Sequence, residues 1–264
     1  MQFRTLLPFL LATSLLAQRP TQSDPLRPPT CPGRAPSSHP TAQQLMETRQ
    51  QAAHDPHYLI AEPPVPNFAQ ERYKLADYYD CAPGAGCYWA DIDAQYNRAI
   101  AVLDQAIATK KRGEKLAIVL DIDETTLSAY CEEKREDFGY IGSMFNQWVV
   151  SPEASLPFAG TLRLVEKAQT AGVEIFFLTG RPEDQRAATA RNLETAGFHN
   201  WKELYLREPG MYTSTIEYKS AQRAKIVAAG YRLVLNIGDQ YSDLFGTPQA
   251  ETSVKLPNPF YYLP

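Results

Sequence analysis

The chain has 264 residues, of which 44% are apolar and 21% are charged, so it is long enough and apolar enough to bury a substantial core. Its formal net charge of -4 is spread without a basic block, which argues against nucleic acid or an anionic membrane surface as a partner. An anionic substrate would therefore have to be held by a few local groups.

The N-terminal segment, residues 1–17, has the features of a secretory signal peptide. Arg4 comes before an apolar run, Leu6 to Leu16, that is short for a membrane span and is followed by candidate cleavage points after Ser14 or Ala17. A buried N-terminal helix is the alternative, which an early proline and the polar stretch that follows disfavour. No cysteine directly follows the run, so we expect an exported protein, periplasmic or secreted, without a stable membrane anchor.

Export places the four cysteines in a setting where disulfides form. Cys81 and Cys87 flank the turn-forming sequence CAPGAGC, which favours a short-loop bridge, and Cys31 and Cys131 remain as a second pair. Free thiols are the main alternative. A metal site formed by these cysteines is disfavoured because the sequence contains no CxxC pair.

Residues 18–64 are rich in Pro, Ser, Thr and Arg, which predicts a largely disordered linker because such a segment has little apolar surface to offset its ordering entropy. The domain proper is expected at 65–264. It begins with a small helical N-terminal part, 65–112, where apolar residues three and four apart predict amphipathic helices at 67–80 and 90–111.

From residue 116 onward, apolar runs of strand length alternate with helical patterns. The predicted strands are 116–121, 173–178, 203–206 and 231–237, and the predicted helices between them are 161–172, 183–197 and 218–230. Continuous apolar strands separated by helices predict an α/β fold with a central parallel sheet covered on both faces, which gives three layers. The segment 127–157 is expected to be a small insertion after the first strand. In such sheets, ligands bind beyond the carboxyl ends of the strands.

Polar residues follow three of the predicted strands at that same edge. They are Asp121, Asp123 and Glu124 after the first strand, Thr179, Gly180 and Arg181 after the second, and Asp239 and Asp243 after the last. Converging carboxylates repel one another unless a cation or a raised pKa relieves them. Oxygen ligands favour Mg²⁺, which binds one or two carboxylates together with a substrate phosphate oxygen.

This arrangement of residues indicates phosphoryl transfer. Asp121, kept ionised by the metal, could attack phosphorus and form an aspartyl phosphate. Asp123 could protonate the leaving oxygen and then activate water. Because phosphoryl transfer depends on positioning and charge neutralisation, a hydroxyl and a cation are also expected, and Thr179 and Lys219 are the candidates.

Four stretches resemble the four motifs of the haloacid dehalogenase (HAD) superfamily, namely IVLDIDETTLSAY, FFLTGR, EYKSAQRAK and LNIGDQYSD. The DIDET sequence and the GDxxxD ending are similar to those of the class C (lipoprotein e-like, subfamily IIIB) acid phosphatases, which are related to plant acid phosphatases and vegetative storage proteins. The resemblance covers the chain from about residue 65 to its end. It implies a Rossmannoid fold and an Mg²⁺-dependent acid phosphatase acting on small phosphomonoesters, with nucleoside monophosphates as candidates.

The resemblance also implies a role for each matching residue. Asp121 would be the nucleophile and Asp123 the acid and base; Asp121, Asp123 through its backbone carbonyl, Asp239 and Asp243 would bind Mg²⁺; Thr179, with Gly180 beside it, and Lys219 would bind the phosphoryl group. The last motif departs from the family pattern in its Gln-Tyr pair, which leaves the chemistry intact. Many members are lipoproteins, whereas this chain has no cysteine placed for a lipid anchor.

Other polar and aromatic residues each allow two interpretations. Glu124 fits either a direct role in the site or that of a solvated or supporting acid. Arg181 is expected to cap a backbone segment or to pair with an acid, with contact to the substrate as the alternative. The insertion is rich in aromatic residues, of which Tyr130 and Trp148 are the candidates for stacking on a flat substrate group, with a small satellite core as the alternative.

Three other functions fit parts of this pattern. A phosphate-binding or storage protein on the same fold would bind without turnover, but it leaves the acid pair unexplained. A receiver-type signalling domain also phosphorylates an aspartate, but it normally lacks a second, proton-transferring acid such as Asp123. A phosphotransferase would use the same site with an alcohol as acceptor. A homodimer is a candidate assembly.

Overall fold

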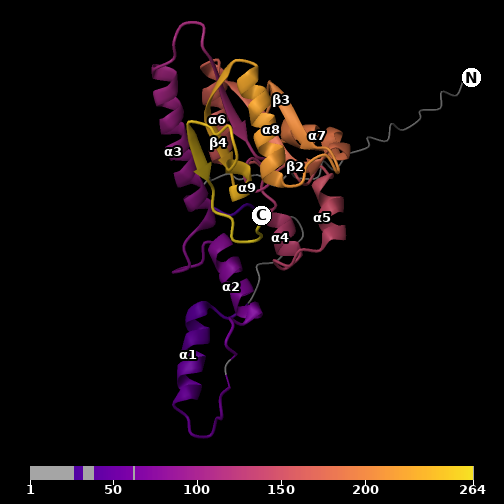
Figure 1. Cartoon of the computed structure of the whole chain (residues 1–264). Coiled ribbons are helices and arrows are strands. Elements are labelled where there is room, and N and C mark those ends of the chain that lie inside the picture. The colour runs from indigo at the N-terminus through magenta and orange to yellow at the C-terminus, as the bar shows by residue number, and fades with distance from the viewer. Residues whose placement is uncertain (1–26, 32–38, 62, 264) are drawn as a thin grey trace, which may run out of the picture.

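A computed structural model describes residues 27–31, 39–61 and 63–263 (Figure 1). The expected signal peptide, 1–17, lies outside the described residues. A five-stranded sheet forms the centre, with neighbouring strands parallel throughout and in the order β3-β2-β1-β4-β5. The strands are β1 (Lys115–Leu120), β2 (Glu174–Pro182), β3 (Glu203–Arg207), β4 (Tyr231–Gly238) and β5 (Thr252–Lys255).

Helices precede the sheet and connect its strands. They are α1 (Ala42–Ala53), α2 (Phe68–Tyr79), α3 (Tyr88–Ala108), α4 (Tyr130–Arg135), α5 (Gly142–Val149), α6 (Ala159–Thr170), the short 3-10 helix η1 (Glu183–Gln185), α7 (Arg186–Ala196), α8 (Thr215–Ala228) and α9 (Tyr241–Leu244). None of the helices in the described part of the chain is long and apolar enough to cross a membrane.

Alternate residues of β1 separate the core into two layers, as the two-residue period of a strand requires. Leu116, Ile118 and Leu120 face the larger core, which α3 and α6 cover. Ala117 and Val119 face the smaller core, which α8 covers. The expected arrangement of helix, parallel sheet and helix is therefore confirmed (Figure 1).

The strand order places the site at one edge. From β1 the chain moves outward to β2 and β3, and it then returns to add β4 and β5 on the opposite side of β1. The direction of winding therefore reverses between β1 and β4, and the carboxyl ends of these two strands flank the point at which ligands bind in sheets of this kind.

The structure differs from one expectation in a part of the N-terminal segment. Residues 42–53, within the range 18–64 for which the sequence predicted a largely disordered linker, form α1. A capping box starts this helix: the Thr41 hydroxyl accepts the Gln44 backbone N–H at 3.2 Å, and the Gln44 side chain accepts the Thr41 N–H at 2.8 Å. The sequence AQQLMETRQQAA then supplies strong helix formers, although the segment around it is rich in proline.

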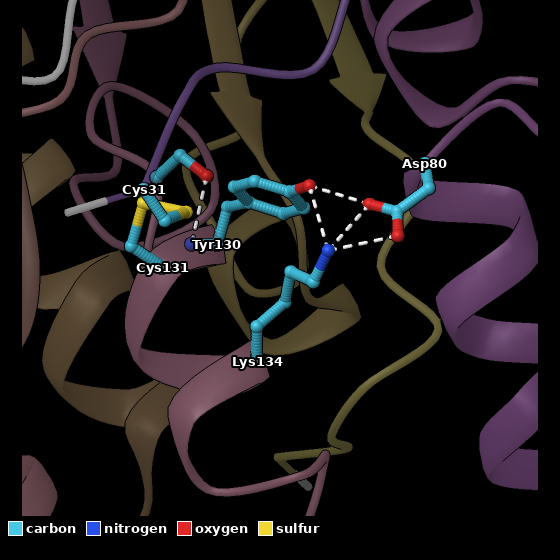
Figure 2. The surroundings of a disulfide bond; sticks show 6 residues. Cys31, Asp80, Tyr130, Cys131 and Lys134 are labelled. Carbon is cyan, nitrogen blue, oxygen red and sulfur yellow. Dashed lines mark hydrogen bonds and ion pairs between the residues drawn. A yellow bond between two sulfur atoms is a disulfide. The ribbon is translucent and has the colours of Figure 1, made fainter. Parts of the chain in front are cut away.

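Both expected disulfides are present. Cys81 and Cys87 close the turn between α2 and α3, and Cys31 joins the N-terminal segment to Cys131 in α4, with Cα atoms 5.3 Å apart (Figure 2). The alternative of free thiols is therefore wrong, because all four cysteines are paired. The second bridge connects residues 100 positions apart, so the N-terminal segment is attached to the insertion after β1.

Candidate active site

The carboxyl end of β1 holds the proposed nucleophile in a defined turn. The Asp121 N–H donates to the Ile237 carbonyl of β4 at 2.9 Å, and the Thr126 hydroxyl donates to the Asp121 carbonyl at 2.5 Å. The Asp121 side chain is only 8% exposed. These bonds fix the backbone on both sides of the carboxylate, so the side chain enters the site from a rigid position.

Three of the predicted metal ligands meet in one cluster. Carboxylate oxygens of Asp121, Asp239 and Asp243 all lie within 4.8 Å of one another, and all three residues are buried. The Lys219 ammonium lies 2.6 Å from Asp121 Oδ1 and 2.5 Å from Asp243 Oδ1. Three carboxylates and one ammonium leave an excess of two negative charges, and hard oxygen ligands in this number fit a divalent cation.

The electrostatics of the cluster reflect the same excess of negative charge. Burial raises the pKa of Asp121 well above its ordinary value, and the Lys219 ammonium opposes that shift. Burial, with a contribution from neighbouring Asp243, raises the pKa of Asp239 to about 6. These raised pKa values mean that the ionised carboxylates are destabilised in the buried site, and a bound cation would offset that destabilisation.

Asp123 lies outside this carboxylate cluster. Its side chain forms a bidentate pair with Arg181, in which Nη2 donates to Oδ1 at 2.6 Å and Nε donates to Oδ2 at 3.0 Å. The sequence prediction that Arg181 pairs with an acid is therefore confirmed. The Asp123 side chain remains 23% exposed, so it can reach a ligand at the edge of the sheet.

The end of β2 supplies the predicted phosphate-binding residues. Thr179 is buried, and its hydroxyl accepts the Arg181 backbone N–H at 3.1 Å. Gly180 between them is exposed, and the position where a Cβ would stand has no atom within 4 Å. The strand end therefore leaves open space at Gly180.

The sequence analysis missed the residues that orient Asp239. The Asn258 side-chain amide donates to Asp239 Oδ2 at 2.6 Å, the Gln240 amide donates to the same oxygen at 2.7 Å, and the Thr125 hydroxyl lies 3.3 Å from Oδ1. Thr125 and Gln240 lie inside two of the four quoted motifs, so the sequence carries a signal for both. Asn258 lies after β5, in LPNPF, where no periodic pattern indicates a function.

A glycine is required immediately before Asp239. A Cβ at Gly238 would stand 2.3 to 2.7 Å from atoms of the Asp243 side chain, so any larger residue would displace that carboxylate. The end of β4 therefore allows the two acids of the GDxxxD motif to approach each other closely.

The aromatic residues chosen for substrate contact lie in packed surroundings. Tyr130 is 2% exposed, stacks on Tyr79 with ring centroids 5.1 Å apart, and donates its hydroxyl to Asp80 at 2.5 Å (Figure 2). Trp148 belongs to a small cluster with Phe145 and three other residues of the insertion. The alternative of a satellite core describes Trp148, which is 6% exposed, whereas Tyr130 packs against the main core.

Comparison with known proteins identifies the family and shows a similar fold. The chain belongs to the HAD superfamily, subfamily IIIB (acid phosphatase), whose family model matches residues 47–264. The solved structure of the class C acid phosphatase of Bacillus anthracis with tungstate bound aligns at a TM-score of 0.60 and 25% identity, over 74% of this chain and 86% of that one. The resemblance noted in the sequence is therefore confirmed.

Curated relatives include plant proteins with different names. The chain is 39% identical to the stem 31 kDa glycoprotein of Glycine max over 55% of this chain and 59% of the relative, and 39% identical to acid phosphatase 1 of Solanum lycopersicum over 55% and 58%. It is 32% identical to vegetative storage protein 1 of Arabidopsis thaliana over 55% of each chain. The matches thus span less than two thirds of these relatives.

Proposed function

We propose that this protein is an exported, Mg²⁺-dependent acid phosphatase that hydrolyses small phosphomonoesters through an aspartyl phosphate on Asp121. The observation that carries the proposal is the environment of Asp121, which contacts Lys219 at 2.6 Å and lies in one cluster with Asp239 and Asp243. Membership of the acid phosphatase subfamily supports the reaction class.

Asp121, Asp239 and Asp243 would hold the metal, together with the Asp123 backbone carbonyl, as the family resemblance implies. Bound there, Mg²⁺ would neutralise charge on the phosphoryl oxygens during transfer. The two negative charges in excess at this cluster support a divalent ion.

In the first step, an Asp121 carboxylate oxygen attacks phosphorus while the bond from phosphorus to the leaving oxygen breaks. Asp123, held by Arg181, donates a proton to that oxygen, so the alcohol leaves neutral. Lys219 favours the ionised form of Asp121 and balances charge on the phosphoryl group, which Thr179 and Gly180 help to hold.

In the second step, Asp123 removes a proton from a water molecule. The water oxygen attacks phosphorus, the bond to Asp121 breaks, and inorganic phosphate and the free carboxylate are restored. Arg181 orients the same carboxylate in both steps, since its planar guanidinium bonds both Asp123 oxygens.

Export is part of the proposal. Two disulfides, one joining residues 100 positions apart, are typical of proteins that fold in an oxidising compartment. Nucleoside monophosphates are the proposed preferred substrates. A comparison of kcat/KM for nucleotides, sugar phosphates and aryl phosphates would test that preference.

The direct test measures phosphate release from an aryl phosphate between about pH 4 and pH 8, with Mg²⁺ or with a chelator. We expect metal-dependent turnover in the wild-type protein, loss of it in Asp121→Asn, and unchanged turnover in the control Asp184→Asn, which alters an exposed acid in η1. Activity in Asp121→Asn, or none in the wild-type protein, would contradict the proposal.

The name of the storage-protein relatives favours one second candidate, a protein that binds phosphate without turnover. It predicts saturable binding of phosphate and no product. Phosphotransfer is a variant of the proposed reaction, and product analysis in the presence of an acceptor alcohol would reveal it.

A further inference from the structure

Glu124 is a buried acid to which the proposed reaction gives no part. It follows Asp123 directly in the DIDET loop and is 0% exposed. Its φ angle is +50°, in the left-handed region that residues other than glycine rarely adopt. A charged side chain thus occupies a backbone position that favours glycine, so some interaction of that side chain must stabilise the conformation.

Three hydrogen bonds surround the carboxylate. The Tyr79 and Tyr88 hydroxyls both donate to Oε2, at 2.9 and 2.7 Å, and the Ala129 N–H donates to Oε1 at 2.5 Å. The two tyrosine rings are stacked, with centroids 4.2 Å apart and an angle of 16° between their planes. The acid is therefore held from both sides, by the loop itself and by a rigid aromatic pair.

The two tyrosines come from the ends of neighbouring helices. Tyr79 is the last residue of α2, Tyr88 is the first residue of α3, and the Cys81–Cys87 disulfide closes the turn between them. This turn, residues 79–88, therefore presents two hydroxyls at a fixed spacing to one carboxylate oxygen.

The same helix also holds the next residue of the loop. Tyr96, two turns further along α3, donates its hydroxyl to the Thr125 carbonyl at 2.5 Å, and Thr161 of α6 donates to the same oxygen at 3.0 Å. Thr125 in turn contacts Asp239. The contacts from α3 thus fall on the two loop residues that directly follow Asp123.

We propose that Glu124 is a positioning residue, through which Tyr79, Tyr88 and the turn that carries them hold the DIDET loop in the geometry that in-line attack requires. This role rests on the proposed function, because it concerns the aim of Asp121 and Asp123. A shift of about 1 Å in a reacting group costs on the order of 100-fold in rate, so a buried residue that is one position from Asp123 and three positions from Asp121 can affect the rate by holding both in place.

The alternative is a polar network that contributes only to stability. The two roles differ in what they change. A positioning residue alters kcat and leaves KM nearly constant, whereas a residue that only stabilises the fold lowers the melting temperature without altering turnover in the protein that remains folded.

The test is the double variant Tyr79→Phe, Tyr88→Phe, which keeps both rings and removes both donors to Oε2. We expect kcat to fall about ten-fold or more and KM to stay within about two-fold, since misplacement acts on the chemical step. The matched control is Tyr78→Phe in the same helix, whose hydroxyl donates to Asp91 at 2.6 Å away from the loop. It should keep the wild-type kcat.

Two substitutions of Glu124 itself, one conservative and one not, test the same proposal through kcat. Gln in Glu124→Gln can accept from Ala129 through its oxygen and donate to the tyrosine oxygens through its amide, so kcat should stay within about three-fold of wild type. In Glu124→Ala no such rescue exists, and kcat should fall about 100-fold. Equal kcat in wild type, Glu124→Ala and the folded double variant would overturn the proposal.

A readout independent of turnover separates this proposal from the proposed function. Amide hydrogen exchange at Ala129 should become about ten-fold faster in the double variant and remain unchanged in Tyr78→Phe. If the wild-type protein lacked phosphatase activity, the proposed reaction would fail while this measurement still decided whether the tyrosines hold the loop. Unchanged exchange at Ala129 would show that the two tyrosines do not hold the loop. If the double variant does not fold, the two single Phe variants provide the same measurement.

Discussion

Lys219 offers the sharpest perturbation of the site, because its ammonium contacts both Asp121 and Asp243 while its side chain is only 3% exposed. We predict that Lys219→Met leaves the three clustered carboxylates without that partner in the absence of metal. Removing one member of a buried ion pair typically costs about 3–5 kcal/mol, since the remaining charges keep their desolvation penalty.

The expected effect on melting temperature follows from the size of the domain. For 150–250 residues, 1 kcal/mol shifts the melting temperature by roughly 2–4 °C, so the variant should melt about 6–20 °C below wild type in a chelator. Scanning calorimetry measures this directly. Lys225→Met, an exposed position of the same helix, is the matched control and should melt within about 2 °C of wild type.

The effect of Mg²⁺ on the melting temperature provides a second test. With the ammonium removed, the excess of negative charge at the cluster rises, so Mg²⁺ should raise the melting temperature more in Lys219→Met than in wild type, even though turnover is lost. An equal melting temperature for the variant and wild type in chelator would show that the ion pairs do not form as described. An equal Mg²⁺ response would refute the assignment of this cluster as the metal site.

Three further predictions concern other parts of the molecule. Burial raises the pKa of Glu133 to about 8 from 4.5, so the stability that its proton contributes is fully present below about pH 4.5 and is lost as pH rises through about 8. At about 1.4 kcal/mol for each pKa unit, wild type should lose roughly 3–5 kcal/mol relative to Glu133→Gln over that range in urea titrations. Arg181→Lys replaces the two donor nitrogens of a planar guanidinium by a single ammonium, which does not fix the plane of the Asp123 carboxylate, so kcat should fall about ten-fold for alkyl phosphates and less for aryl phosphates, whose leaving groups need less proton donation. Gly160→Ala would place a Cβ 2.6 Å from the Tyr96 ring and should cost about 1–3 kcal/mol in unfolding free energy.

Each of these has an outcome that contradicts it. Parallel pH profiles for wild type and Glu133→Gln would mean that this carboxyl is not protonated in the folded state. An equal loss for alkyl and aryl substrates in Arg181→Lys would mean that Arg181 does not act through the proton of Asp123. For Gly160→Ala the matched control is Gly142→Ala, where an added Cβ meets its nearest neighbour at 3.4 Å, and equal effects of the two would refute the close approach to Tyr96.

Strands with a continuous apolar run were predictable from the sequence, whereas several short elements were not. The runs at 116–121 and 231–237 correspond to β1 and β4, because a strand buried on both faces has to be apolar throughout. The four residues of β5 carry no such run and become a strand only by pairing with β4. The short helices α4, α5 and α9 were missed for a similar reason, since too few turns exist to reveal a period.

The sequence by itself determined which carboxylates form the buried cluster, because Asp121, Asp239 and Asp243 follow predicted strands and parallel strands bring their carboxyl ends to one edge. Only the tertiary structure decided the rest. The contacts of Glu124 with Tyr79 and Tyr88 span 45 and 36 residues and join helix ends whose local patterns carry no information about the loop. Such contacts depend on how helices pack on the sheet, and packing is a property of the whole fold rather than of any segment.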